Sequence, residues 1–359
     1  MKFLNVVGAR PNFMKIAPLQ RELDRKGYER VLVHTGQHYD EEMSEQFYED
    51  LGMSPPDYNL AVGSDTQAAQ TARVMERIEP VIDDEDPDWV IVVGDVNSTL
   101  AAGLVAAKKS SNLAHIEAGI RSGNREMPEE INRVIVDRIS DALFCFDEEA
   151  EATLESEGIA SDRIHLVGDI MIDSLKYTLD QLNGTVRPDV ELPEEYAVLT
   201  LHRPSNVDNL PSLEQAFEIL KEVNRDLPLV FPIHPRTEES LERHGLLKTW
   251  RNEFNLIPPL NYGEFVSLMN NARAVLTDSG SIQQETSVMD VPCLTLRKQT
   301  ERAVTIRKGT NRLVGMDRDA ILSSVEEIKN NNWKTAEDIP LWDGQTARRI
   351  VQVFEDLQS

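Results

Sequence analysis

The sequence has few cysteines and no long hydrophobic run. Its 359 residues include two cysteines, Cys145 and Cys293, and each lies inside a hydrophobic run typical of a strand. We therefore expect small core residues rather than a disulfide or metal ligands. No apolar run has the length of a membrane-spanning helix. Arg10, Pro11 and Asn12 interrupt the apolar start before a signal peptide can form. These absences favour a cytoplasmic protein without a membrane partner.

Basic residues are also scarce. The chain has 37 lysines and arginines against 62 aspartates and glutamates, which gives a formal charge of −25. A nucleic-acid partner is not expected, because such a protein needs a basic surface. The acidic surplus is either an ordinary solvated surface or an adaptation to high intracellular salt, which would screen the repulsion. If the substrate is an anion, basic groups must then be concentrated at its site.

Several common cofactor motifs are missing. There is no G-x-G-x-x-G after a strand, no G-x-x-x-x-G-K-[ST] and no G-x-S-x-G, so NAD binding, a P-loop and a nucleophile elbow are not indicated. His34 and His38 are four residues apart, but across a strand end and a loop rather than on one helix face. We therefore expect no metal site and no cofactor.

The length and the hydrophobic pattern predict two α/β domains. A chain of 359 residues exceeds what one core usually serves. Short apolar runs alternate with helix-length amphipathic segments, and most runs are continuously hydrophobic, as in parallel strands covered on both faces. Turn formers and acidic groups between about 168 and 195 indicate a hinge. The expected domains are 1–170 and 171–344, with about six strands each. An amphipathic helix at about 345–359 can pack back on the first.

Polar residues follow many of the predicted strands. In open parallel sheets, ligands bind at the carboxyl ends of the strands. Two such domains facing each other would form a cleft with polar groups on both walls. The segments with this placement are Gly8–Pro11, His34–His38, Gly94–Asp95, His115–Gly119, His202–Arg203, His234–Arg236, Asp278–Gly280 and Arg297.

Each of these residues also has an ordinary structural explanation. Asp95 can be the N-cap of the next helix, and His202 can be a satisfied loop histidine. Glu117 and Glu129 can be surface acids. What favours a site is the combination of carboxylates, histidines and cations at equivalent positions of the two predicted sheets.

The segment Asp278–Glu285 is the clearest binding element. A strand ends, a turn of small residues follows, and a helix begins. Backbone N–H groups and the helix dipole at such a turn suit a diphosphate. Glu285, one turn into the helix, can accept hydrogen bonds from ribose hydroxyls. An ordinary capped turn would explain the segment equally well, because Asp278 and Ser279 also suit a cap.

Taken together, these segments resemble the non-hydrolysing UDP-N-acetylglucosamine 2-epimerases, over about residues 8–315. The resemblance implies two Rossmann-like domains with parallel sheets facing across a cleft, as in GT-B glycosyltransferases, and a homodimer. The matching motifs are Gly8–Lys15, Thr35–His38, Gly94–Asp95, His115–Arg121, Pro128–Arg133, His202–Arg203, His234–Pro235, Asp278–Glu285, Thr300–Arg302 and Gly309–Asn311.

The resemblance also implies a reversible epimerisation at C2. UDP leaves C1 while the C2 proton is removed; the resulting 2-acetamidoglucal is reprotonated on the other face, and UDP re-adds. The implied catalytic residues are Asp95, Glu117, Glu129 and His202. The implied UDP and substrate ligands are Arg10, Lys15, Arg133, Arg203, Ser279, Gly280, Ser281, Glu285 and Arg302. A second, activating UDP-sugar would contact Gln37 and His234.

The chain departs from the family pattern at several positions. Asn12 stands where many members have Glu, Arg203 is followed by Pro204-Ser205-Asn206 rather than Arg-Glu-Asn, and Ser281 replaces a second Gly. A modified sugar, such as a 2,3-diacetamido uronic acid, fits these changes as well. A glycosyltransferase of the same fold, a hydrolysing epimerase and a non-catalytic nucleotide-sugar sensor would also bind a UDP-sugar. The transferase would not need a cluster of carboxylates.

Overall fold

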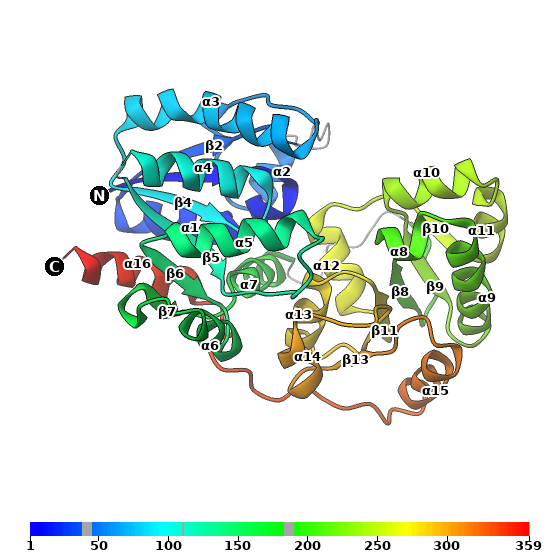
Figure 1. The fold of residues 1–359 in the computed structure, drawn as a ribbon. Helices are drawn as coiled ribbons and strands as arrows, with labels where there is room; N and C mark the ends of the chain where they lie inside the picture. Colours follow the sequence, from blue (N-terminus) through cyan, green and yellow to red (C-terminus); the bar gives the residue numbers. More distant parts are fainter. Residues whose placement is uncertain (38–44, 110, 183–189, 359) are drawn as a thin grey trace. The chain divides into compact units, whose positions relative to one another are not determined.

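The computed structural model describes residues 1–37, 45–109, 111–182 and 190–358. Its backbone divides into two units, shown in Figure 1: residues 1–177 with 340–359, and residues 178–339. Each unit is described below by itself. His38, which belongs to one of the motifs named above, lies outside the described residues.

The first unit contains a seven-stranded sheet with the order β3-β2-β1-β4-β5-β6-β7. Each pair of neighbouring strands is parallel, which confirms the predicted α/β class. The strands are β1 (Lys2–Val7), β2 (Glu29–His34), β3 (Tyr58–Asn59), β4 (Trp89–Val93), β5 (Asn112–Ala118), β6 (Ala142–Cys145) and β7 (Ile164–Leu166). The helices are α1 (Arg10–Lys26), α2 (Glu45–Asp50), α3 (Gln67–Glu85), α4 (Asn97–Lys108), α5 (Pro128–Ile139), α6 (Glu148–Ser156), α7 (Ile170–Leu182) and α16 (Thr346–Leu357). The boundary between the two units falls within α7, after Tyr177.

Both faces of this sheet are buried, which explains its continuously hydrophobic strands. Leu4 and Val6 of β1 belong to one core cluster with residues of α3, α4 and α5. Phe3, which points to the opposite face, packs against Phe354 of α16 with a ring-centroid distance of 5.0 Å. Because successive side chains of a strand point to opposite faces, a strand covered by two helix layers must be apolar throughout. Cys145 is fully buried in β6 with a free thiol, as predicted.

The second unit contains a six-stranded parallel sheet with the order β10-β9-β8-β11-β12-β13. Cys293 is buried in β12, again with a free thiol. The strands are β8 (Ala197–Thr200), β9 (Leu229–Pro232), β10 (Asn255–Ile257), β11 (Ala274–Thr277), β12 (Cys293–Thr295) and β13 (Asn311–Leu313). The helices are α8 (Pro204–Val207), α9 (Leu210–Asp226), α10 (Pro235–Arg243), α11 (Leu247–Glu253), α12 (Tyr262–Asn270), α13 (Ser281–Val288), α14 (Ala303–Arg307) and α15 (Arg318–Lys329).

The sequence missed one strand. Only about six strands were expected in each half, and β3 is a two-residue edge strand, Tyr58–Asn59, too short to produce a hydrophobic period. It pairs in parallel with the end of β2, Tyr58 with Val33 and Asn59 with His34. Among the described residues, no helix is long and apolar enough to cross a membrane.

The C-terminal helix α16 packs in the first unit, against α1 (Figure 1). Its Phe354 is fully buried and contacts Trp89 and Phe144, with ring centroids 4.9 and 5.3 Å apart. Asp173 of α7 accepts hydrogen bonds from the backbone N–H groups of Thr346 (3.0 Å) and Ala347 (2.8 Å). These are the first two N–H groups of α16, which have no partner within the helix. Asp173 therefore caps α16 from another element.

We predict that Asp173→Ala will loosen α16. The substitution leaves two buried N–H groups without an acceptor, at a cost of about 1–3 kcal/mol. Amide hydrogen exchange read by mass spectrometry should show faster exchange in residues 346–357. Asp180→Ala, an exposed position on the same helix α7, is the control. Unchanged exchange in the Asp173 variant would contradict the capping role.

Candidate active site

Both sheets have the strand order of a doubly wound fold. Strands β1 and β4 are neighbours in the first sheet, and β8 and β11 are neighbours in the second. The connections from these neighbouring strands run to opposite sides, so the chain leaves a crevice beyond their carboxyl ends, where such folds bind ligands. Gly8 and Gly94 follow β1 and β4, and His202 and Asp278 come shortly after β8 and β11. Four of the eight predicted site segments, those that begin at Gly8, Gly94, His202 and Asp278, therefore lie at the switch points of the two sheets.

Glu117 lies at a bulge near the end of β5. The pairing between β5 and β6 shifts register between Ile116 and Ala118, and Glu117 has a φ of 68°. Positive φ is uncommon for a residue with a side chain and occurs at functional sites supported by their surroundings. The Glu117 side chain is 4% exposed and forms an ion pair with Lys15 of α1. The bulge thus directs the buried Glu117 carboxylate toward Lys15, which lies on α1 between β1 and β2.

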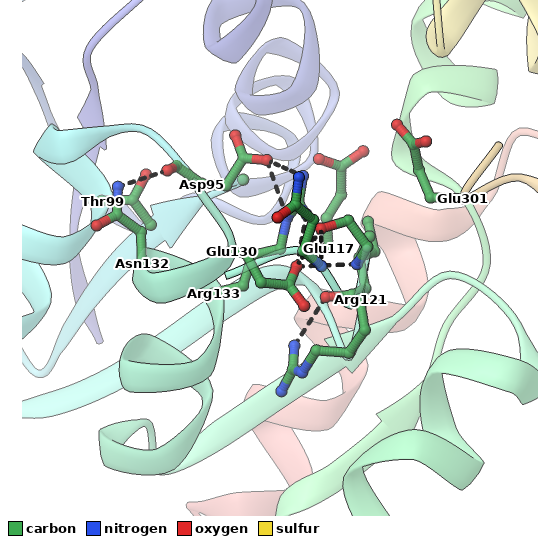
Figure 2. Close-up of polar contacts among 12 residues, drawn as sticks. Asp95, Thr99, Glu117, Arg121, Glu130, Asn132, Arg133 and Glu301 are labelled. Carbon is green, nitrogen blue, oxygen red and sulfur yellow. Dashed lines mark hydrogen bonds and ion pairs between the residues drawn. The ribbon is translucent and has the colours of Figure 1, made fainter. Parts of the chain in front are cut away.

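Asp95 belongs to a second charged group (Figure 2). Its Oδ2 accepts hydrogen bonds from Arg133 Nε (3.0 Å) and Nη2 (2.5 Å). Arg133 Nη1 also donates to Glu130 Oε2 at 3.0 Å. The Asp95 side chain remains 30% exposed. Helix α4 begins at Asn97 after Val96, so Asp95 is not its N-cap. The ordinary explanation for Asp95 is therefore wrong.

Glu130 organises the loop that precedes α5. Its carboxylate accepts hydrogen bonds from the backbone N–H groups of Ser122 and Gly123 and from the Ser122 hydroxyl. Burial opposes the ionisation of Glu130, but these donors and Arg133 outweigh it, and the pKa of Glu130 lies below its usual range. Glu129, the predicted catalytic residue, is half-buried on the first turn of α5. Glu130 anchors the loop, and Glu129 is its immediate neighbour.

Asn12 joins the ends of β1 and β4. Its Oδ1 accepts from the N–H groups of Gly8 (3.1 Å) and Ala9 (3.0 Å), and its Nδ2 donates to Val93 O (3.4 Å). An amide has both donor and acceptor atoms, so one Asn12 side chain can bind both strand ends. Arg10, at the start of α1, lies 5.4 Å from the centroid of the Phe47 ring.

Gln37 is buried beside the start of α4. Its Oε1 accepts hydrogen bonds from Ser98 N (3.0 Å) and Ser98 Oγ (2.7 Å). His234, the other residue predicted for an activator, is exposed in the second unit and caps α10 by accepting from Arg236 N at 3.1 Å. The ring of His234 stacks on His202, with centroids 5.2 Å apart.

In the second unit, His202 pairs with Asp278. His202 Nδ1 lies 2.9 Å from Asp278 Oδ1, and Asp278 also accepts from the backbone N–H groups of His202 and Arg203 and from Asn206 Nδ2. Burial opposes the ionisation of Asp278, but the hydrogen bond from His202 and the other donors outweigh it and lower its pKa. An ionised Asp278 requires a hydrogen on Nδ1, which leaves Nε2 of the partly exposed His202 available to a ligand.

The turn before α13 is held by a buried amide. Gln283 Nε2 donates to Ser279 O at 2.8 Å, and Gln283 Oε1 accepts from Thr300 Oγ1 (2.8 Å) and Asn311 Nδ2 (3.0 Å). Ser281 is the first residue of the helix and Gly280 precedes it. Gln283 of α13 thus ties this turn to two other segments, those of Thr300 and Asn311, which preorganises the turn for an anion.

Glu285, one turn further, is 2% exposed and accepts from Tyr262 Oη at 2.8 Å. Arg302 is also buried, at the N-cap of α14. Arg203 lies 4.0 Å from Glu301, and Arg297 lies 2.8 Å from the other oxygen of that carboxylate. Burial opposes the ionisation of Glu301, but Arg297 outweighs it, and the pKa of Glu301 falls to about 2. Arg203 and Arg297 thus both lie beside Glu301 in the second unit.

Three functional candidates were missed by the sequence reasoning: Asp137, Glu130 and the pairing role of Asp278. Glu130, Arg133 and Asp137 are spaced by three and four residues, so they share one face of α5. That spacing was the available signal, but the many acidic residues of the chain obscured it. Among the described residues, no group of three or more His, Cys, Asp or Glu side chains could hold a metal ion.

Known proteins resemble the chain over nearly its whole length. The family model described as UDP-N-acetylglucosamine 2-epimerase matches residues 21–355. A UDP-N-acetylglucosamine 2-epimerase of Methanocaldococcus jannaschii is 40% identical, with 99% of each chain covered. A UDP-2,3-diacetamido-2,3-dideoxy-D-glucuronate 2-epimerase of Pseudomonas aeruginosa is also 40% identical, over 99% of this chain and 100% of the relative.

Solved structures agree. The crystal structure of the Methanocaldococcus jannaschii UDP-GlcNAc 2-epimerase in complex with UDP-GlcNAc and UDP has a TM-score of 0.86 at 38% identity, covering 99% of this chain and 100% of that one. The Neisseria meningitidis UDP-GlcNAc 2-epimerase bound to UDP-GlcNAc has a TM-score of 0.86 at 27% identity, with the same coverage. The match to the family model and these relatives show that the chain belongs to the UDP-N-acetylglucosamine 2-epimerase family.

Proposed function

We propose that the protein catalyses the reversible conversion of UDP-N-acetylglucosamine to UDP-N-acetylmannosamine. The observation that carries this proposal is the pair of carboxylates at the carboxyl edge of the first sheet. Glu117 is held by Lys15 and Asp95 by Arg133. Two positioned carboxylates suit a reaction in which a proton leaves one face of a carbon and returns to the other.

The proposed reaction begins with an elimination. The C2–H bond breaks and its proton passes to a base of the protein, while the C1–O bond breaks and UDP leaves with the electron pair. The C1–C2 double bond of 2-acetamidoglucal forms from the C2–H electrons. An acid then protonates C2 from the opposite face, and the diphosphate of UDP attacks C1. No electron is gained or lost overall, so the reaction requires no redox cofactor.

In this proposal, Asp95, Glu117 and Glu129 transfer the protons. The C2 hydrogen is only weakly acidic, so the base must be held close to it and away from bulk water. Glu117 meets this requirement, because it is 4% exposed and its charge is balanced by Lys15. Arg10, Lys15 and Arg133 supply positive charge to the substrate from the same unit.

The second unit holds the nucleotide in this proposal. The N–H groups of Gly280 and Ser281 and the hydroxyl of Ser279 bind the diphosphate, because the Ser279 N–H already donates to Thr277 Oγ1 at 2.9 Å. Glu285 accepts from the ribose. Negative charge grows on the diphosphate as it leaves, so donors aimed at it stabilise the transition state. His202 is such a donor when Nε2 is protonated, with Asp278 balancing the added charge. Arg203 and Arg302 complete the set.

We further propose a cytoplasmic homodimer that supplies precursors for surface polysaccharide or glycan synthesis. Support for the dimer comes from α5, where Ile131 and Val134 are each 43% exposed and Ile135 is 36% exposed. Their spacing places the three side chains on one face of the helix. Such a face suits a two-fold contact, in which the same surface meets itself.

The reaction itself can be tested by isotope exchange. We predict that incubation of the protein with UDP-N-acetylglucosamine in D2O will give UDP-N-acetylmannosamine with deuterium at C2, seen by proton NMR. Accumulation of free N-acetylmannosamine would indicate the hydrolysing reaction instead. No change in this sugar, combined with turnover of a UDP-2,3-diacetamido uronic acid, would assign the modified substrate. Binding of UDP with neither turnover would support a glycosyltransferase.

The proton-transfer residues can be tested by substitution. We predict that Glu117→Gln, Asp95→Asn and His202→Ala will each lower kcat by at least roughly 100-fold, because each removes an acid, base or leaving-group donor. Circular dichroism should show a folded protein in each case. Glu155→Gln, an exposed position on α6, is the matched control and should keep full activity. A fully active Glu117 variant would refute the proposed mechanism.

The dimer can be tested by its mass in solution. We predict that light scattering coupled to size exclusion will give about twice the 40.5 kDa chain mass for the unaltered protein. Ile131→Glu should halve this mass, because it places carboxylates opposite each other across the two-fold contact. Leu357→Glu, at another exposed apolar position, should not. A monomeric unaltered protein would overturn the homodimer.

A further inference from the structure

The bulge that carries Glu117 needs support from its surroundings. Its backbone is in the left-handed region, which disfavours a side chain and persists only when neighbouring contacts hold it. Small shifts of this backbone would move the Glu117 carboxylate, which in the proposed reaction must lie close to C2 of the sugar. The residues on both sides of the bulge, His115 and Gly119, make contacts that the mechanism above does not use.

His115 links the bulge to Asp95. Its ring is fully buried on β5, with Nε2 2.7 Å from Gly94 O and Nδ1 2.6 Å from Asp137 Oδ1. Gly94 is the residue before Asp95, and its φ of 69° sets the turn on which Asp95 projects. The histidine therefore bridges the strand that bears Glu117 and the turn that bears Asp95.

Asp137 of α5 closes the other side of the bulge. Its Oδ2 accepts from Gly119 N at 3.1 Å and from Arg121 Nη1 at 2.7 Å, while Oδ1 faces His115. The carboxylate is 1% exposed. Burial opposes its ionisation, but the hydrogen bond from His115 and the charge of Arg121 outweigh it and lower its pKa. Removing one of these contacts would leave a buried charge poorly satisfied.

We propose that Asp137 and His115 form a buried positioning pair that fixes Glu117 and Asp95 relative to each other. Through Gly119 N and His115, Asp137 holds the residues that flank Glu117, and through Gly94 O, His115 holds the turn of Asp95. Neither residue touches the substrate in this proposal. It rests on the proposed function, because it assigns the pair to the two carboxylates of that reaction.

The chain offers a matched control for this pair at the other end of β5. Asp141 Oδ2 accepts from Leu113 N at 2.9 Å, near the start of the strand, and Asp141 is exposed. Asp137→Asn and Asp141→Asn thus each remove one carboxylate charge, and each disturbs a contact with β5 or the residue that follows it. Only the first change affects the end that carries Glu117.

The experiment measures kcat, KM and UDP affinity for both variants and for His115→Gln. A misplaced carboxylate slows proton transfer without weakening nucleotide binding, so Asp137→Asn and His115→Gln should lower kcat by roughly 10- to 100-fold. KM and UDP affinity should stay within about threefold, and deuterium incorporation at C2 should slow in parallel with kcat. Asp141→Asn should behave like the unaltered protein.

Amide hydrogen exchange provides a readout that does not need activity. Asp137→Asn should accelerate exchange in both segments, 93–96 and 115–119, and Asp141→Asn in neither. Unchanged kcat in Asp137→Asn, or a loss matched by weaker UDP binding and a lower unfolding temperature, would overturn the positioning role. If the unaltered protein shows no epimerisation, the proposed function fails. The exchange pattern then still decides whether the pair holds the two segments.

Discussion

The site depends on the parallel pairing of every strand in both sheets. Parallel strands place all their carboxyl ends at one edge of the sheet. Residues that follow different strands, and are far apart in sequence, therefore lie close together at that edge. In the first unit this edge gathers Lys15 of α1, Asp95 of the turn after β4 and Glu117 at the end of β5. In the second it gathers His202 and Asp278. An antiparallel partner in the centre of either sheet would split these groups between two edges.

Charges at this edge are arranged in pairs. Lys15 balances Glu117, Arg133 balances Asp95 and Glu130, and Arg297 balances Glu301. The chain as a whole carries a formal charge of −25, and in each unit these cations lie directly beside buried or half-buried carboxylates. Paired groups that are already oriented cost little reorganisation when charge moves during a reaction.

The sequence predicted the fold class and the polar residues at the carboxyl ends of the strands, because hydrophobic runs and the residues that follow them can be recognised without a structure. It did not predict the bulge at Glu117, because a strand with one extra residue has the same apolar pattern as a regular one. Asp137 was missed for a different reason. Its partners, His115 and Gly119, lie on another element, and its own helix contains several acidic residues. The pairing of His202 with Asp278 likewise depends on the adjacency of β8 and β11, which no local pattern specifies.

The return of α16 to the first unit affects how the protein can fold during synthesis. Phe354 fills the core between Phe3, Trp89 and Phe144, which belong to the first half of the chain. Domains generally fold in order as they leave the ribosome. Here one face of the first sheet lacks Phe354 until the second unit and α16 have been translated. Until α16 is made, the side chains of Phe3, Trp89 and Phe144 lack their contacts with Phe354, and loss of the last helix by early termination would leave them exposed.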